Sequence, residues 1–175
     1  MLQRIQRLFK HRWHDQATLH RALPPAALQR LTQGVRESEK QHSGELRIFI
    51  EAGLPARELW RSIPLPQIIR QRALSQFAAL RVWDTEHNNG VLIYLLLAEH
   101  AIEICADRGL QRRVTSAQWQ AMIARMGTAF REDRFEDGLN QAIDELTALL
   151  TQHFALAPGM DNPNELPDTP VLGTS

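Results

Sequence analysis

The chain carries a polar loop that runs directly into an apolar stretch: Asp84-Thr85-Glu86-His87-Asn88-Asn89-Gly90-Val91-Leu92-Ile93-Tyr94-Leu95-Leu96-Leu97. The apolar part contains no charged residue. Successive side chains of a strand point to opposite faces of its sheet, so an unbroken apolar strand has both faces buried. The stretch therefore predicts the central strand of a sheet that helices cover on both sides.

Two further strands surround this central strand in the sequence. The first is expected at Glu45–Glu51, and a helix from about Gln67 to Trp83 connects it to the central strand, so these two strands are expected to be parallel. Only the short reversal Ala98–Ala101 precedes a third strand at Ile102–Asp107, which is therefore expected to be antiparallel to the second. The pattern predicts an α/β fold, with a small mixed β-sheet of three to four strands flanked by helices as an α-β-α sandwich.

The sequence divides into three parts. Residues 1–39 form a basic helical N-terminal extension, residues 40–154 form the α/β domain, and residues 155–175 form a proline-rich tail without periodicity. Such a tail cannot bury enough apolar surface to order itself, so we expect disorder there. Within the domain, Thr115 and Gln118 have the spacing of a capping box, which predicts the start of a helix.

The basic extension has two interpretations. Its apolar residues fall near helical spacing: Leu2, Ile5, Leu8, Phe9 and Trp13. In the first interpretation, the helix packs on the domain and presents a solvated basic face. In the second, residues 1–20 form an amphipathic helix that lies on an anionic membrane surface or on a partner.

Composition excludes several classes of protein. Twenty basic and 20 acidic side chains leave no net charge, which argues against a nucleic-acid binder. The single cysteine, Cys105, excludes a disulfide within the chain and a multi-cysteine metal site. The longest apolar run, Val91–Ala98, is too short to span a bilayer, and the first residues lack the apolar core of a signal peptide. A cytoplasmic location is therefore expected.

The predicted topology brings three polar segments to one edge of the sheet. Two parallel strands begin at that edge and the third strand ends there, so Gly44-Glu45, the loop Asp84–Gly90 and Asp107-Arg108-Gly109 should converge. Carboxylate and amide oxygens are the ligands that a hard cation such as calcium or magnesium prefers. The candidate ligands are Asp84, Glu86, Asn88, Asn89 and Asp107.

The loop is not a calcium-binding EF-hand. Counted from Asp84, glycine falls at the seventh position instead of the sixth, and the twelfth position is Leu95 in a strand instead of glutamate. A simpler interpretation also stays open. Asn88-Asn89-Gly90 then supplies a turn with positive φ, and Asp84 caps it locally.

Several segments resemble the TPM domain, over about residues 40–154. The most specific is Asn88-Asn89-Gly90-Val91-Leu92-Ile93-Tyr94, and weaker matches are Ser43-Gly44-Glu45-Leu46-Arg47, Ile102-Glu103-Ile104, Asp107-Arg108-Gly109-Leu110, and Phe130 through Phe135 to Gly138-Leu139. That family includes a plant thylakoid-lumen protein linked to photosystem II repair and an animal acetylcholine-receptor modulator. The resemblance implies a small helix-flanked sheet, calcium binding in some members and a weak phosphatase activity.

The chain departs from this family in two respects. Many relatives are exported or anchored, whereas this sequence shows no evident signal peptide or membrane anchor. Many relatives also carry a glycine-rich turn where this chain has Ala106-Asp107-Arg108-Gly109, so the resemblance does not imply Asp107 as a ligand.

The sequence is compatible with two functions. The first is a non-catalytic interaction module for an unknown protein partner, which aids assembly or repair of a membrane-associated complex and has a divalent-cation loop. The second is a weak metal-assisted phosphatase at the same edge. The sequence contains no motif for an activated nucleophile, which favours the first.

Overall fold

A four-stranded mixed sheet forms the centre of the protein. The computed structural model describes residues 10, 11, 13, 14 and 16–173. The strands are β1 (Leu46–Glu51), β2 (Val91–Leu96), β3 (Ala101–Ala106) and β4 (Val171–Gly173), in the order β3-β2-β1-β4. β1 is parallel to β2 and β4, and β2 is antiparallel to β3, so the predicted pairing of the first three strands is confirmed.

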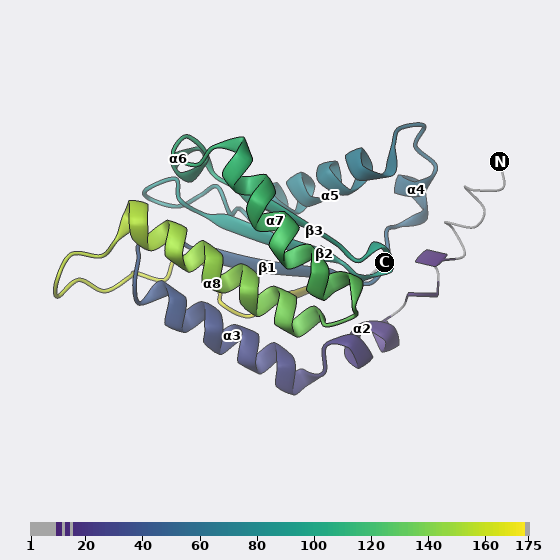
Figure 1. Ribbon diagram of the computed structural model, residues 1–175, viewed down its shortest axis with the longest axis horizontal. Helices are drawn as coiled ribbons and strands as arrows, with labels where there is room; N and C mark the ends of the chain where they lie inside the picture. Colours follow the sequence, from purple (N-terminus) through teal and green to yellow (C-terminus); the bar gives the residue numbers. More distant parts are fainter. Residues whose placement is uncertain (1–9, 12, 15, 174–175) are drawn as a thin grey trace.

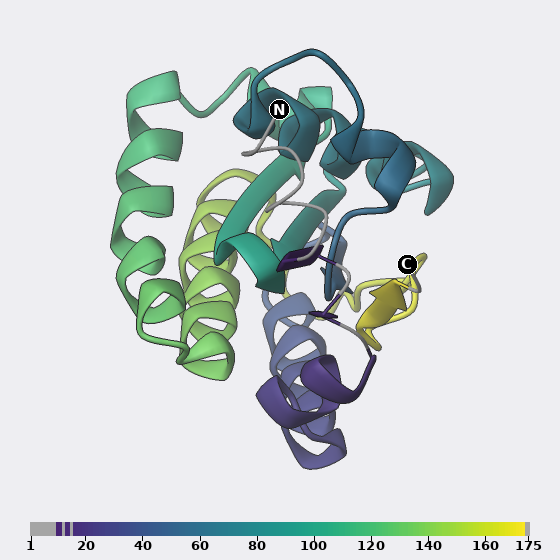
Figure 2. The ribbon, with the colours of Figure 1, turned by 90° about the vertical axis from the view of Figure 1, so that its right-hand side faces the viewer.

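Helices cover both faces of the sheet (Figure 1). The helical segments are α2 (Gln16–Ala22), α3 (Pro25–Glu39), α4 (Ala56–Leu59), α5 (Leu65–Ala79), the 3-10 turn η1 (Leu97–Glu99), α6 (Arg108–Gln111), α7 (Ser116–Arg131) and α8 (Phe135–Phe154). Figures 1 and 2 show α3, α7 and α8 on one face and α4 and α5 on the other. The predicted α-β-α sandwich is confirmed. The connection from β1 to α5 contains the short helix α4, which ends just before Trp60.

Strand alternation explains this layering. Leu46, Ile48 and Ile50 of β1 point into the core cluster that contains α3, α7 and α8, whereas Phe49 points into the cluster that contains α5. Every residue of β2 is buried, with alternate side chains in the two clusters. The apolar stretch therefore forms a central strand that is buried on both faces, as its composition predicts.

The described part of the basic extension belongs to the same core. Leu19 and Leu23, and Leu31 and Val35 of α3, are buried in the cluster beneath α7 and α8. The apolar pattern predicted for Leu2–Phe9 lies outside the described residues. Of the described helices, none is long and apolar enough to cross a membrane.

The C-terminal tail differs from the disorder that the sequence predicts for residues 155–175. Ala155 forms an isolated bridge with His42, the amide of Leu166 donates to Glu45 Oε2 at 3.0 Å, and Asp168 pairs with Arg36 at 3.1 Å. The tail then adds β4, the yellow strand in Figure 2, to β1. These contacts join residues more than one hundred positions apart, so local composition could not indicate them.

Candidate functional site: the polar edge and the β3 cleft

Three loops meet at the edge where β1 and β2 begin and β3 ends. The amide of Val91 donates to the carbonyl oxygen of Glu45 at 2.8 Å, and the amide of Asp107 donates to that of Gly90 at 2.9 Å. The amide of Gly109 donates to the carbonyl oxygen of Asn88 at 2.8 Å. The convergence of these backbones, which the strand directions predict, is confirmed.

Two glycines permit this close approach. A Cβ atom on Gly90 would collide with the carbonyl oxygen of Val82, and one on Gly109 would collide with that of Asn88. Both obstacles are main-chain atoms, which cannot rotate away as a side chain does. Gly109 therefore fixes the spacing between the loop 84–90 and the segment that follows β3, and Gly90 fixes the spacing between the start of β2 and Val82.

The structure gives the outer candidate ligands partners within the protein. Asp84 is exposed and pairs with Arg81 at 2.7 Å. Glu86 is exposed, and its amide faces the carboxylate of Glu165 at 3.2 Å. The carboxylate of Asp84 therefore has a partner within the protein, whereas Glu86 makes its contact through its main-chain amide.

The next candidate ligand, Asn88, holds the two loops together. Its φ is 52°, which is the left-handed conformation expected for a tight turn. Its Oδ1 accepts a hydrogen bond from Arg108 Nε at 2.8 Å. Asn88 therefore adopts the positive φ that the simpler interpretation of the sequence gives it, as part of a turn.

The remaining two candidates, Asn89 and Asp107, have a different character. Asn89 is fully buried, and its Nδ2 donates to the carbonyl oxygen of Ser43 at 3.0 Å. Asp107 caps α6, because its Oδ1 accepts from the amide of Arg108. Within the described residues, Asn89 Oδ1 and Asp107 Oδ2 are buried atoms that have no hydrogen-bond partner.

Glu45 lies at the same edge but is held by the tail. It is buried, and the amide of Leu166 occupies its Oε2. Burial raises the pKa of this carboxyl, and the amides of the tail oppose the rise. Over the described residues, no group of three or more histidine, cysteine, aspartate or glutamate side chains is arranged to hold a metal ion. The five-residue metal site stays a prediction.

Two side chains of the nucleophilic type, Cys105 and Ser38, lie inside the protein. Burial raises the pKa of the Cys105 thiol to about 11, which keeps it protonated at neutral pH. Ser38 Oγ lies 2.9 Å from Nε2 of His42, whose Nδ1 donates to the carbonyl oxygen of Gly44 at 3.1 Å. Ser38 and His42 are both buried, and burial lowers the pKa of His42 to about 4. This serine–histidine pair, which sequence reasoning missed, therefore connects α3 to the start of β1.

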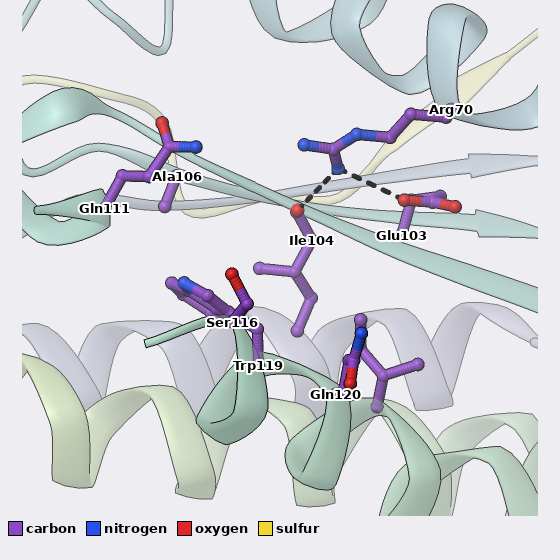
Figure 3. A pocket seen from close by; sticks show the side chains of 9 residues that line it. Arg70, Glu103, Ile104, Ala106, Gln111, Ser116, Trp119 and Gln120 are labelled. Carbon is purple, nitrogen blue, oxygen red and sulfur yellow. Dashed lines mark hydrogen bonds and ion pairs between the residues drawn. The ribbon is translucent and has the colours of Figure 1, made fainter. Parts of the chain in front are cut away.

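A second site, which sequence reasoning also missed, is a cleft of about 360 Å³ beside β3. Figure 3 shows Arg70 on one side of the edge strand and the residues of α7 on the other. The main lining residues are Arg70, Glu103, Ile104, Gln111, Trp119 and Ile123. Trp119 and Ile123 are partly buried and also pack against the core beneath α7. The alternation of apolar and polar residues in Ile102-Glu103-Ile104 could have indicated this cleft, because it is typical of a strand with one polar face.

Comparison with known proteins agrees with this architecture. An NMR structure of the BA42 protein from the psychrophilic bacterium Bizionia argentinensis sp. nov. is similar, with a TM-score of 0.72 and 25% sequence identity. The similarity covers 86% of this chain and 95% of that protein. A search of curated protein sequences finds no match. A family model described as the TPM domain matches residues 17–149. Since this match spans most of the sequence and contains all the sheet except β4, the chain belongs to the TPM domain family.

Proposed function

We propose that this chain is a non-catalytic interaction module that aids assembly or repair of a membrane-associated complex, with a divalent cation bound at its polar edge. Membership of the TPM domain family supports the assembly role. The burial of Cys105 and of the Ser38–His42 pair supports a non-catalytic function, because a nucleophile must reach its substrate.

One observation supports a bound cation at this edge. Asn89 Oδ1 and Asp107 Oδ2 are buried, without a partner among the described residues, where three loops converge. A buried oxygen without a partner costs about 1–3 kcal/mol of folding free energy. Calcium or magnesium, ligated by such oxygens and by water, would offset that cost. Glu86 and Asp84 would then contribute from the exposed part of the loop.

Thermal unfolding tests the cation site. A ligand that binds only the folded state, at ten times its Kd, stabilises that state by about 1.4 kcal/mol. For a chain of this length, we expect a rise in melting temperature of about 3–6 °C in calcium or magnesium relative to EDTA. Asp107→Asn should remove most of this rise, whereas Asp144→Asn, on the exposed face of α8, should leave it unchanged.

The cation proposal fails if neither cation raises the melting temperature at millimolar concentration. It also fails if the rise is equal in the unmodified protein and in Asp107→Asn.

The alternative function that the sequence leaves open is a weak metal-assisted phosphatase. It predicts that magnesium-dependent turnover of a phosphate monoester falls in folded Asp84→Asn and Asp107→Asn proteins. Turnover that is equal in all three proteins indicates a contaminating enzyme.

We also propose that residues 1–20 make peripheral contact with an anionic membrane. The exposed indole of Trp13, with 79% of its surface accessible, supports this contact, since tryptophan favours the membrane interface. Flotation with vesicles that contain phosphatidylserine provides the test. The double variant Arg4→Glu/Arg7→Glu should lose flotation, and Arg57→Glu, on the exposed side of α4, should retain it. Equal flotation of both variants would contradict the proposal.

A further inference from the structure

β3 is an edge strand whose outer main-chain groups face a cleft. It pairs with β2 on one side only, as the strand order shows. The amide of Asp107 points toward β2, where it donates to Gly90. Because main-chain direction alternates in an antiparallel pair, Ile102, Ile104 and Ala106 direct their amide and carbonyl groups away from β2. This row of groups can pair with another strand.

The middle carbonyl of that row is covered by a side chain of α5. Arg70 Nη1 donates to the carbonyl oxygen of Ile104 at 2.8 Å and to Glu103 Oε2 at 3.1 Å (Figure 3). The Arg70 side chain is still 40% exposed. It therefore blocks indiscriminate strand pairing while it presents a positive charge to the solvent.

The two walls of the cleft differ in chemistry. On the α7 side, Trp119 and Ile123 provide apolar surface beside Ile104, flanked by the polar side chains of Ser116 and Gln120. On the α5 side, the wall consists of Arg70 and Glu103. Alternate side chains of an added strand would point toward these two walls in turn. One face of that strand would be apolar, and the other would meet the guanidinium group.

We propose that an extended acidic segment of a partner protein binds this cleft as an added strand on β3. An aliphatic side chain of the segment packs against Trp119 and Ile123, and the carboxylate of the adjacent residue, which points to the opposite face, pairs with Arg70. This inference deepens the proposed interaction role by naming the partner surface. It requires no cation at the polar edge.

Charge complementarity and hydrogen bonding favour this occupant. The guanidinium of Arg70 can turn from the carbonyl oxygen of Ile104 to the incoming carboxylate, because both are acceptors. The freed carbonyl then accepts a hydrogen bond from an amide of the added strand. The five N–H donors of the Arg70 guanidinium suffice both for the incoming carboxylate and for Glu103, which already lies 3.1 Å from Nη1. Arg108 and Arg112 are exposed just beyond the end of β3 and extend the positive surface. A cleft of about 360 Å³ has the size of an ordinary ligand site.

The probe is a displayed library of random ten-residue peptides, selected on the full chain in EDTA and again in calcium. Selected peptides are synthesised, and their Kd is measured by fluorescence anisotropy. We expect enrichment of sequences that alternate aliphatic and acidic residues. Bound peptide should slow amide hydrogen exchange at Ile102, Ile104 and Ala106. Arg70→Gln should raise the Kd at least ten-fold, whereas Arg131→Gln, near the exposed end of α7, should change it less than two-fold.

Three results would overturn the proposal. The first is no enrichment over an unrelated protein. The second is protection of amides outside β3 in the unmodified protein, a measurement that does not depend on the folding of any variant. The third is a concentration-dependent dimer, seen by sedimentation equilibrium without peptide, that protects β3, because a second copy would then occupy the cleft. Peptide binding without a cation-induced rise in melting temperature would reject only the cation site.

Discussion

Arg72 of α5 and Glu51 of β1 form a buried, bidentate ion pair that joins the helix to the sheet. Arg72 Nε donates to Glu51 Oε2 at 3.0 Å, and Nη2 donates to Oε1 at 2.6 Å. Glu51 is fully buried, and the Arg72 side chain is 12% exposed. The hydroxyl of Tyr94 also donates to Glu51 Oε2, at 2.7 Å. The hydrogen bonds with Glu51 raise the pKa of Arg72, so this cation stays charged and fixes α5 on the sheet.

Arg72→Met should destabilise the protein strongly, because it leaves the carboxylate of Glu51 buried without its cation. Loss of one partner of a buried ion pair costs about 3–5 kcal/mol. Denaturant unfolding measures this loss. The double variant Glu51→Leu/Arg72→Met should recover much of the lost stability, and Arg57→Met, at the exposed surface, should cost little. A loss below about 1 kcal/mol in Arg72→Met would show that the pair does not hold α5 in place.

Glu39 should make the protein less stable as the pH rises. Burial raises the pKa of this carboxyl from 4.5 to about 9, and the nearby acids Glu45 and Asp168 add to the rise. The folded protein therefore retains a proton that the unfolded chain releases. Stability contributed by this proton is complete below about pH 4.5 and is lost as the pH rises toward about 9.

The variant Glu39→Gln tests this dependence, because glutamine stays neutral and can still accept from the amide of Leu46. Denaturant unfolding at several pH values should show equal stability near pH 4.5 and an advantage for the variant, on the order of 2 kcal/mol, near pH 8. The matched variant Glu37→Gln, at an exposed position of α3, should show no advantage that grows with pH. A constant difference between Glu39→Gln and the unmodified protein would contradict the assignment.

Gly109→Ala should weaken the polar edge, because its methyl group would collide with the carbonyl oxygen of Asn88. Forced overpacking of this kind costs about 1–3 kcal/mol. Gly127→Ala, in α7, is the matched control. Its Cβ would meet only the end of the Arg131 side chain, at 3.3 Å, so this change should stabilise the helix by about 0.5–1 kcal/mol. Equal effects of the two changes in thermal unfolding would disprove the close approach.

Thr115→Ala should remove the cap of α7. Thr115 Oγ1 accepts from the amide of Gln118, whose side chain accepts from the amide of Thr115 at 2.8 Å. Loss of this reciprocal pair costs about 1 kcal/mol, or about 2–4 °C in melting temperature. Ser116→Ala, one residue inside the helix, should have a much smaller effect. Similar melting temperatures for Thr115→Ala and the unmodified protein would mean that the capping box contributes nothing to stability.

The capping box shows which features the sequence could predict. Thr115 and Gln118 are three residues apart, so their interaction depends on helix geometry alone. The apolar run of β2 likewise required burial on both faces, wherever its neighbours lay. The lengths of the connections predict the strand directions. The strand directions in turn predict that the loop 84–90 converges with Asp107.

Such local rules could not predict which partner each polar side chain binds. Asn88 and Asn89 are adjacent in the sequence, yet one holds Arg108 at the surface and the other is buried against Ser43. The tail carries no periodicity, and its strand β4 forms because β1 offers an unpaired edge. Segments distant in the sequence provide these partners, so only the packed chain determines them.

By itself, the sequence determined the directions of the first three strands, the central place of β2 and the edge where the polar loops meet. These depend on side-chain alternation and connection length, which are local properties. Only the tertiary structure decided that Arg70 covers the edge strand while Arg72, two residues later, is buried against Glu51. The physical reason is that the docking of α5 on the sheet fixes which carboxylate and which carbonyl each arginine can reach.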